Sequence, residues 1–154
     1  MTIFRSMDIS ASALTAQRLR MDIIGENMAN ATNTRAANGE PYRRKVVVFQ
    51  ERQPSRSFAG QTFAGHLQSS KFRLGTLTPG GVRVARVAED TSDFKLRFDP
   101  EHPDANEEGY VQLPNVDMEK EMVDFLVASR SFEANITAIN NFKAIAMKAL
   151  EIGR

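Results

Sequence analysis

Few side chains in this sequence could do chemistry. It contains two histidines, His66 and His102, and no cysteine, which excludes disulfides, thiolate metal sites and cysteine nucleophiles. Residues 99–106, Asp-Pro-Glu-His-Pro-Asp-Ala-Asn, are dense in oxygen and nitrogen ligands that could bind a metal ion. Two prolines fix the backbone there, so the segment equally suits a rigid turn between strands. We favour the turn and expect no metal and no cofactor.

Groups of carboxylates and of cations suggest two further functions, acid–base catalysis and nucleic-acid binding. Asp117, Glu119 and Glu121 could pair as general acid and base, but at the start of a helix such groups more often offset the helix dipole. A basic patch, Arg43-Arg44-Lys45, could bind nucleic acid, although an acidic stretch follows it. A nucleic-acid or small-ligand binding module therefore stands as the alternative to a structural protein, and we expect no enzyme.

The two signs of charge are segregated along the chain. Residues 35–88 carry ten Lys or Arg against two acidic residues, and residues 89–124 carry twelve Asp or Glu against three basic ones. Such blocks can form complementary contacts between copies or simply face solvent. The contact would join the basic patch, Arg43, Arg44 and Lys45, to an acidic stretch on a neighbour. The acidic side would be Asp99, Glu101, Asp104, Glu107 and Glu108.

The N-terminal segment has the spacing of an amphipathic helix. Alternate steps of four and three from Ile3 meet mostly apolar residues, namely Met7, Leu14, Met21, Ile24 and Met28. The helix should end within residues 27–34, where Asn and Thr side chains compete for backbone hydrogen bonds.

The C-terminal segment repeats this seam over a greater length. After an N-cap at Asn115 or Asp117 the seam holds Met118, Met122, Phe125, Phe132, Ile136, Ile139 and Leu150. The opposite face is also apolar, through Val123, Val127 and Ile145. A helix apolar on two sides needs more partners than a chain of 154 residues can supply, which favours packing between chains. The alternative is a hairpin in which the two terminal helices pair only with each other.

Between the helices the periodicity changes to that of strands. Residues 45–50, 81–87, 94–98 and 109–113 predict a small antiparallel β unit, and residues 52–80 read as a loop or insertion. The predicted class is α+β, with terminal helices packed as a coiled coil. The expected division is an N-terminal assembly helix at 1–34, a β-rich middle at 35–113 and a C-terminal assembly helix at 114–154. We expect no membrane-spanning segment and no cleaved signal.

Both ends of the chain resemble paired signatures of one family. Residues 12–31, which close on Asn27-Met28-Ala29-Asn30, and residues 128–135 are similar to the terminal signatures of flagellar rod, hook and hook-associated proteins. Residues 41–45, 99–105, 109–111 and 114–116 resemble the proximal-rod type. Thr32-Asn33-Thr34-Arg35 departs from the family's usual Thr-Pro-Gly, and residues 52–75 are longer than usual. The motif residues are Asn27, Ala29, Asn30, Ser129, Arg130, Phe132, Ala134 and Asn135.

The resemblance implies a structural role. Such a subunit would pack its terminal helices as the inner wall of a hollow helical tube in the periplasm, with its β region outside. The tube would transmit torque and line an export channel. Implied partners are other copies and other rod proteins, with no nucleic acid, membrane insertion or small-molecule substrate. The resemblance also implies export by the flagellum's own type III apparatus, without a cleaved signal peptide.

Overall fold

Two long helices flank short strands in the computed structural model, which describes residues 2–36, 39–52 and 80–152. The α+β class expected from the sequence is confirmed. Most of the loop expected at 52–80 lies outside the described residues. The elements, in order, are α1 (Thr2–Ala29), β1 (Lys45–Glu51), β2 (Val82–Glu89), β3 (Lys95–Phe98), β4 (Tyr110–Leu113) and α3 (Met118–Ile152).

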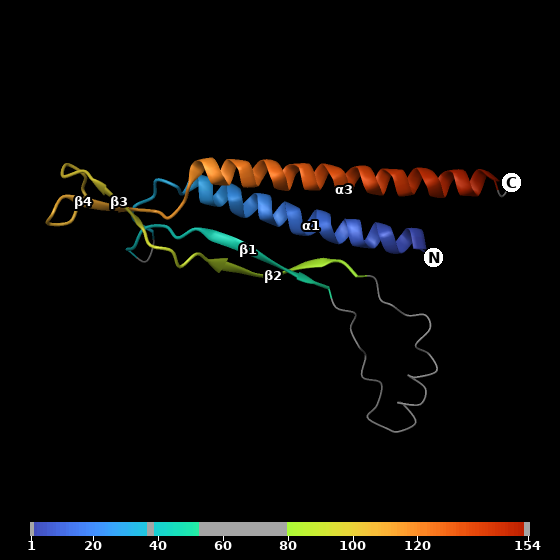
Figure 1. Cartoon of the computed structure of the whole chain (residues 1–154), viewed down its shortest axis with the longest axis horizontal. Coiled ribbons are helices and arrows are strands. Elements are labelled where there is room, and N and C mark those ends of the chain that lie inside the picture. The colour runs from blue at the N-terminus through green and yellow to red at the C-terminus, as the bar shows by residue number, and fades with distance from the viewer. Residues whose placement is uncertain (1, 37–38, 53–79, 153–154) are drawn as a thin grey trace, which may run out of the picture.

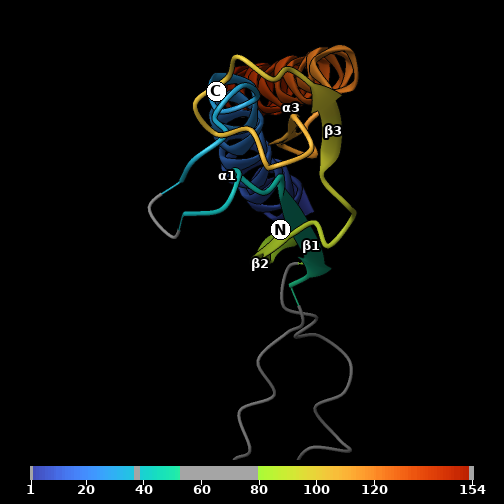
Figure 2. The same cartoon turned by 90° about the vertical axis from the view of Figure 1, so that its left-hand side faces the viewer.

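The helices and the first strand pair form three layers. Helices α1 and α3 lie side by side and run in opposite directions, with the β1–β2 ribbon on the other side of α1 (Figures 1 and 2). Strands β3 and β4 lie beyond the ends of the helices (Figure 1). Helix α1 therefore contacts a helix on one side and strands on the other.

Helix boundaries follow from local hydrogen bonds. Helix α1 ends at Ala29, within the predicted range, where the Asn30 side-chain amide donates to the carbonyl of Glu26 at 2.9 Å. Asp117 is the N-cap of α3, since its carboxylate accepts from the amide of Glu119 at 3.2 Å. Asn115, the other N-cap candidate, instead donates to the carbonyls of Asp90 and Ser92 at 3.0 and 3.2 Å.

The strands form two separate antiparallel ribbons, whereas the sequence predicted one β unit. The β1–β2 register runs from Lys45↔Glu89 to Glu51↔Val82, with a bulge between Val48 and Phe49. The bonds from Asn115 hold the segment after β2 in a bend beside the start of α3, so β3 does not continue along β2. No helix of the described residues is long and apolar enough to cross a membrane.

Close contact at Gly81 fixes the β1–β2 ribbon against α1. Gly81 has φ 153°, and a Cβ there would lie 2.6 Å from the Ser12 hydroxyl oxygen. That oxygen accepts a hydrogen bond from the Val82 amide at 3.1 Å. A side chain at this position would therefore separate the strand from the helix.

We predict that Gly81→Ala destabilises the protein by about 1–3 kcal/mol, because it adds both backbone strain and a clash with Ser12. Gly80→Ala is the matched control, since beyond its chain neighbours no atom of the described residues lies within 4 Å of a Cβ there. Urea unfolding of the two variants and the parent measures the difference. Equal stability of the two variants would contradict the assigned contact.

Candidate functional site

The contact between α1 and α3 is made by small and polar stripes. Asn27 bonds to Glu121 and Arg20 to Asp124, each at 3.1 Å, and these bonds show which sides face each other. Residues three and four apart from these anchors share the same stripes, and none of them is exposed. On α1 the stripe is Ser6, Ser10, Ala13, Gln17, Arg20, Ile24 and Asn27; on α3 it is Glu121, Asp124, Ala128, Ser131, Asn135, Ala138 and Phe142.

The seam predicted for α3 lies outside this contact. Met118, Phe125 and Ile136 are exposed, as are Met122 at 54% and Leu150 at 76%. Phe132 and Ile139 are half-buried. On α1, by contrast, Ile24 is buried and the other predicted seam residues, Met7, Leu14, Met21 and Met28, are half-buried.

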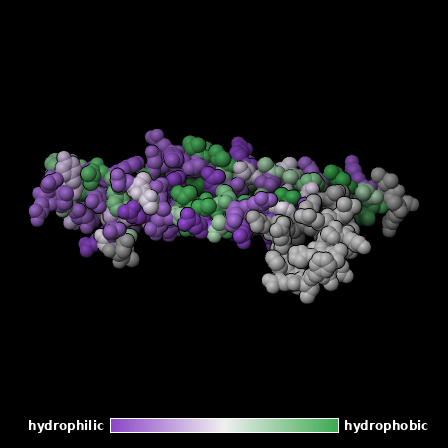
Figure 3. Space-filling model, turned by 60° about the horizontal axis from the view of Figure 1, so that its bottom comes forward, coloured by the Kyte–Doolittle hydropathy of each residue, from purple (hydrophilic) through white to green (hydrophobic). Residues whose placement is uncertain are grey.

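Further large apolar side chains of α3 are exposed as well, namely Val123, Leu126, Val127, Ile145 and Met147. Patches of hydrophobic surface lie along the helical part of the molecule, between hydrophilic areas (Figure 3). The hairpin of two helices, considered from the sequence as an alternative to assembly, does occur. It leaves the apolar seam of α3 uncovered by the described residues.

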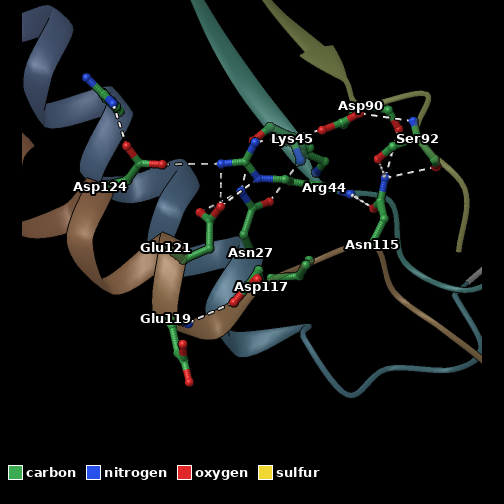
Figure 4. Close-up of polar contacts among 12 residues, drawn as sticks. Asn27, Arg44, Lys45, Asp90, Ser92, Asn115, Asp117, Glu119, Glu121 and Asp124 are labelled. Atoms are coloured by element: carbon green, nitrogen blue, oxygen red, sulfur yellow. Dashed lines mark hydrogen bonds and ion pairs between the residues drawn. The ribbon is translucent and has the colours of Figure 1, made fainter. Parts of the chain in front are cut away.

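A buried polar junction joins α1, α3 and the start of β1. Glu121 is fully buried, and its Oε1 accepts hydrogen bonds from Arg44 at 2.6 Å (Figure 4). The same guanidinium lies 3.4 Å from Asp124 and 3.7 Å from Asp90. The Ser92 amide, 3.0 Å from Asp90, lowers the pKa of that carboxyl, so it remains an anion beside Arg44. Three acidic groups thus surround one cation.

Asn27 uses its whole hydrogen-bonding capacity in this junction. Its Nδ2 donates to Glu121 Oε2 at 3.1 Å and to the carbonyl of Lys45 at 2.8 Å. Its Oδ1 accepts from the Tyr42 hydroxyl and from the Lys45 amide, each at 2.9 Å. An asparagine offers two donors and two acceptor sites, and all four are used. This geometry gives a physical reason for asparagine at a motif position.

The remaining motif residues are spread over both helices. Asn30 caps the end of α1, and Asn135 lies on the α3 stripe, where its amide donates to the Ser131 carbonyl at 2.7 Å. Arg130 is exposed and pairs with Glu133 at 3.1 Å. Ala29 and Ala134 are exposed, and Ser129 and Phe132 are half-buried.

Two of the three cations predicted for contacts between subunits have partners in their own chain. Arg44 binds Glu121, and Lys45 binds Glu26. Arg43 lies 4.3 Å from the centre of the Phe94 ring. The basic patch, which also suggested nucleic-acid binding, thus does not present three free cations.

The acidic residues of that predicted contact lie in the turn between β3 and β4. Asp99 pairs with Arg97 at 2.9 Å, and Asp104 accepts from Thr34 at 2.8 Å. Glu101 is exposed. The His102 Nδ1 accepts from the Asp104 amide at 3.1 Å, and backbone bonds close the segment as a turn. Among the described residues no three His, Cys, Asp or Glu side chains could hold a metal ion, and His66 lies outside them.

The sequence does not reveal the place of Glu121. A carboxylate at the start of a helix is expected to offset the helix dipole, but Glu121 is fully buried and paired with Arg44. Its spacing does indicate the position, because Glu121 is one heptad before Ala128 and two before Asn135. All three residues lie on the stripe that faces α1.

Comparison with known proteins finds similarity along the whole chain. Three relatives are each named flagellar basal-body rod protein FlgC. The one from Bacillus subtilis (strain 168) is 52% identical, over 100% of both chains. The one from Borreliella burgdorferi is 41% identical, over 99% of this chain and 98% of its own, and that from Escherichia coli O157:H7 is 38% identical over 100% of both. The family described as flagellar basal body rod FlgEFG protein C-terminal matches residues 107–152, which include α3 and Glu121.

We predict that Glu121→Gln lowers the free energy of unfolding by about 1–3 kcal/mol, because Arg44 loses its buried counter-charge. Glu119→Gln removes a carboxylate from an exposed position on the same helical turn and should change stability by less than about 0.5 kcal/mol. Urea denaturation followed by circular dichroism compares the two. A similar effect of both substitutions would argue against the junction.

We also predict that Tyr42 ionises far above the ordinary range. Burial raises its pKa to about 12, and the nearby carboxylates of Glu26, Glu121 and Glu89 add to the shift. The pKa of Tyr42 is higher in the folded than in the unfolded protein. Neutral Tyr42 therefore contributes to the stability of the fold, fully so below about pH 10, and this contribution is lost as the pH rises through about 12. The size of the shift corresponds to roughly 2–3 kcal/mol.

The chain has two tyrosines and no tryptophan, so Tyr110→Phe leaves Tyr42 as the sole source of tyrosinate absorbance. A near-ultraviolet pH titration of this variant should have its midpoint near 12. A midpoint near the ordinary value of 10.0 would show that the Tyr42 hydroxyl is not held in the junction.

Proposed function

Because the chain belongs to the FlgC family of flagellar basal-body rod proteins, we propose that it builds the proximal part of the rod by packing its terminal helices against those of neighbouring subunits. Its class is structural and its place is the flagellar basal body.

The exposed apolar surface of α3 supports this proposal most directly. Ten large apolar side chains of this helix are exposed in the single chain, from Met118 to Leu150. Large apolar side chains that stay exposed together on one helix mark an interaction site, because their transfer out of water is favourable. Helices of neighbouring subunits are the proposed partners, and their seams would interlock as in coiled coils.

Contacts between different patches of successive subunits generate an open helical assembly. In the proposed arrangement, residues 1–34 and 114–154 form the wall of a hollow tube and residues 35–113 lie outside. The packed helices would transmit torque and line an export channel, and the tube would cross the periplasm. The subunit would arrive through the flagellum's own type III export apparatus. Other copies and other rod proteins are its partners, and the role needs no cofactor or substrate.

We predict that Ile136→Asp abolishes rod assembly and motility. Burying an unpaired carboxylate between helices costs at least about 2 kcal/mol, and every copy in the assembly would have this cost. Ile136 is exposed in the single chain, so the stability of the isolated protein should change by less than about 0.5 kcal/mol.

Thr137→Asp is the matched control, because it places the same charge on the next residue, which is polar and exposed. Swimming in soft agar and electron microscopy of basal bodies give the readouts. Normal rods in the Ile136→Asp strain would refute the assignment of this face to subunit packing.

A further inference from the structure

The outer face of the β1–β2 ribbon combines apolar and basic side chains. Its register places Val48 opposite Arg86 and Gln50 opposite Arg83, with Val46 on the same face. All five side chains are exposed. Arg83 donates to Gln50 at 3.0 Å, and neither arginine forms an ion pair within the described part of the chain. We call this surface the basic ribbon face.

The outer face of the β3–β4 ribbon has the opposite charge beside an aromatic centre. Leu96 and Phe98 are 65% and 63% exposed, and Tyr110, paired with Phe98, contacts it edge to face at 5.3 Å between ring centres. The Phe98 ring also lies close to Gly109, where a Cβ would be 3.0 Å from it. Val111, on the other face, is buried.

Carboxylates without an ion pair among the described residues lie in the turn of the same ribbon, at Glu101, Glu107 and Glu108. All three are exposed. Together with Leu96, Phe98 and Tyr110 they form a surface that we call the acidic tip. It lies beyond the ends of the helices, whereas the basic ribbon face lies alongside α1 (Figure 1).

We propose that the acidic tip of one copy binds the basic ribbon face of a neighbouring copy, an inference that rests on the proposed function. Each surface has an apolar centre and charges of one sign that form no ion pair among the described residues, and the two signs are opposite. Apolar contact would join the aromatic pair to the two valines, while Arg83 and Arg86 would meet glutamates and can also lie over aromatic rings.

The basic side of this contact differs from the one predicted from the sequence, whereas the acidic side keeps Glu101, Glu107 and Glu108. The cations of residues 43–45 are held by Glu121, Glu26 and the Phe94 ring, so they cannot supply the basic side. Arg83 and Arg86 belong to the same basic stretch of sequence but lie on the outer face of the ribbon, where they are exposed. The two patches differ, so the contact is heterologous and repeats from copy to copy. Packed helices would already hold the copies side by side, so the two surfaces meet at a high local concentration. The contact therefore needs little affinity of its own.

The absence of cysteine permits a direct test in basal bodies. Cells would co-express two differently tagged single-cysteine variants, Val48→Cys and Phe98→Cys, and purified basal bodies would be oxidised. The proposal expects a disulfide-linked dimer that carries both tags. Lys120→Cys replaces Val48→Cys in the matched control, because Lys120 is exposed on α3, away from the basic ribbon face, and should give no such dimer.

Charge reversal provides the second readout of the same contact. Arg83→Glu with Arg86→Glu, added to the Val48→Cys variant, should lower the dimer yield roughly tenfold, since two exposed ion pairs become repulsive. Glu107→Arg with Glu108→Arg in the Phe98→Cys variant should restore it to within about twofold of the parent yield. Reversal on both sides that leaves the yield low would overturn the proposal.

The contact between the acidic tip and the basic ribbon face can be overturned separately from the packing of helices between subunits. Basal bodies that contain both cysteine variants but yield no mixed dimer would overturn this contact and leave the structural role intact. Normal rods from the Ile136→Asp strain would instead remove the basis of the proposed assembly. A mixed dimer that responds to charge reversal and to its compensation would establish the contact.

Discussion

Glu121 is fully buried where α1, α3 and β1 meet, and a carboxylate in that position requires its partners because removal from water is costly. Arg44 comes from the first strand and Asn27 from the end of the first helix, so three distant segments are tied to one group. Rotating α3 to turn its apolar seam toward α1 would carry Glu121 away from both. That would leave buried charges unpaired, at a cost of about 3–5 kcal/mol. The junction therefore determines which side of α3 faces the chain's own helix.

This choice separates two kinds of surface on α3. The stripe toward α1 is rich in Ala, Ser and Asn, which allow close approach but bury little apolar area. The large side chains, such as Met122, Val123 and Leu126, stay outside. The single chain thus keeps a defined fold through polar contacts while the apolar surface of α3 remains exposed. A purely apolar pairing of the two helices would have hidden that surface.

Heptad spacing and strand alternation predicted the order and approximate bounds of the described helices and strands, because both patterns arise from local backbone geometry. They did not determine how α3 is oriented. Its two apolar sides are equivalent by periodicity, and the deciding residues, Glu121 and Asn27, are polar and meet only in the tertiary structure. The same holds for Arg44, whose role as an internal cation depends on a partner far away in the sequence. The separation of the strands into two ribbons also depends on a distant side chain, Asn115, which holds the bend between them.

The pairing of α1 with α3 also decides when the chain can complete its fold. Asn27 and Glu121 are 94 residues apart, and Arg20 and Asp124 are 104 apart. Contacts at such separations form slowly, because a long loop must close before they are made. In a chain that emerges N-terminus first, Arg44 and Asn27 have no Glu121 to bind until the segment beginning at Met118 has followed. Until that moment α1 lacks its helical partner, and an isolated helix is marginal in water.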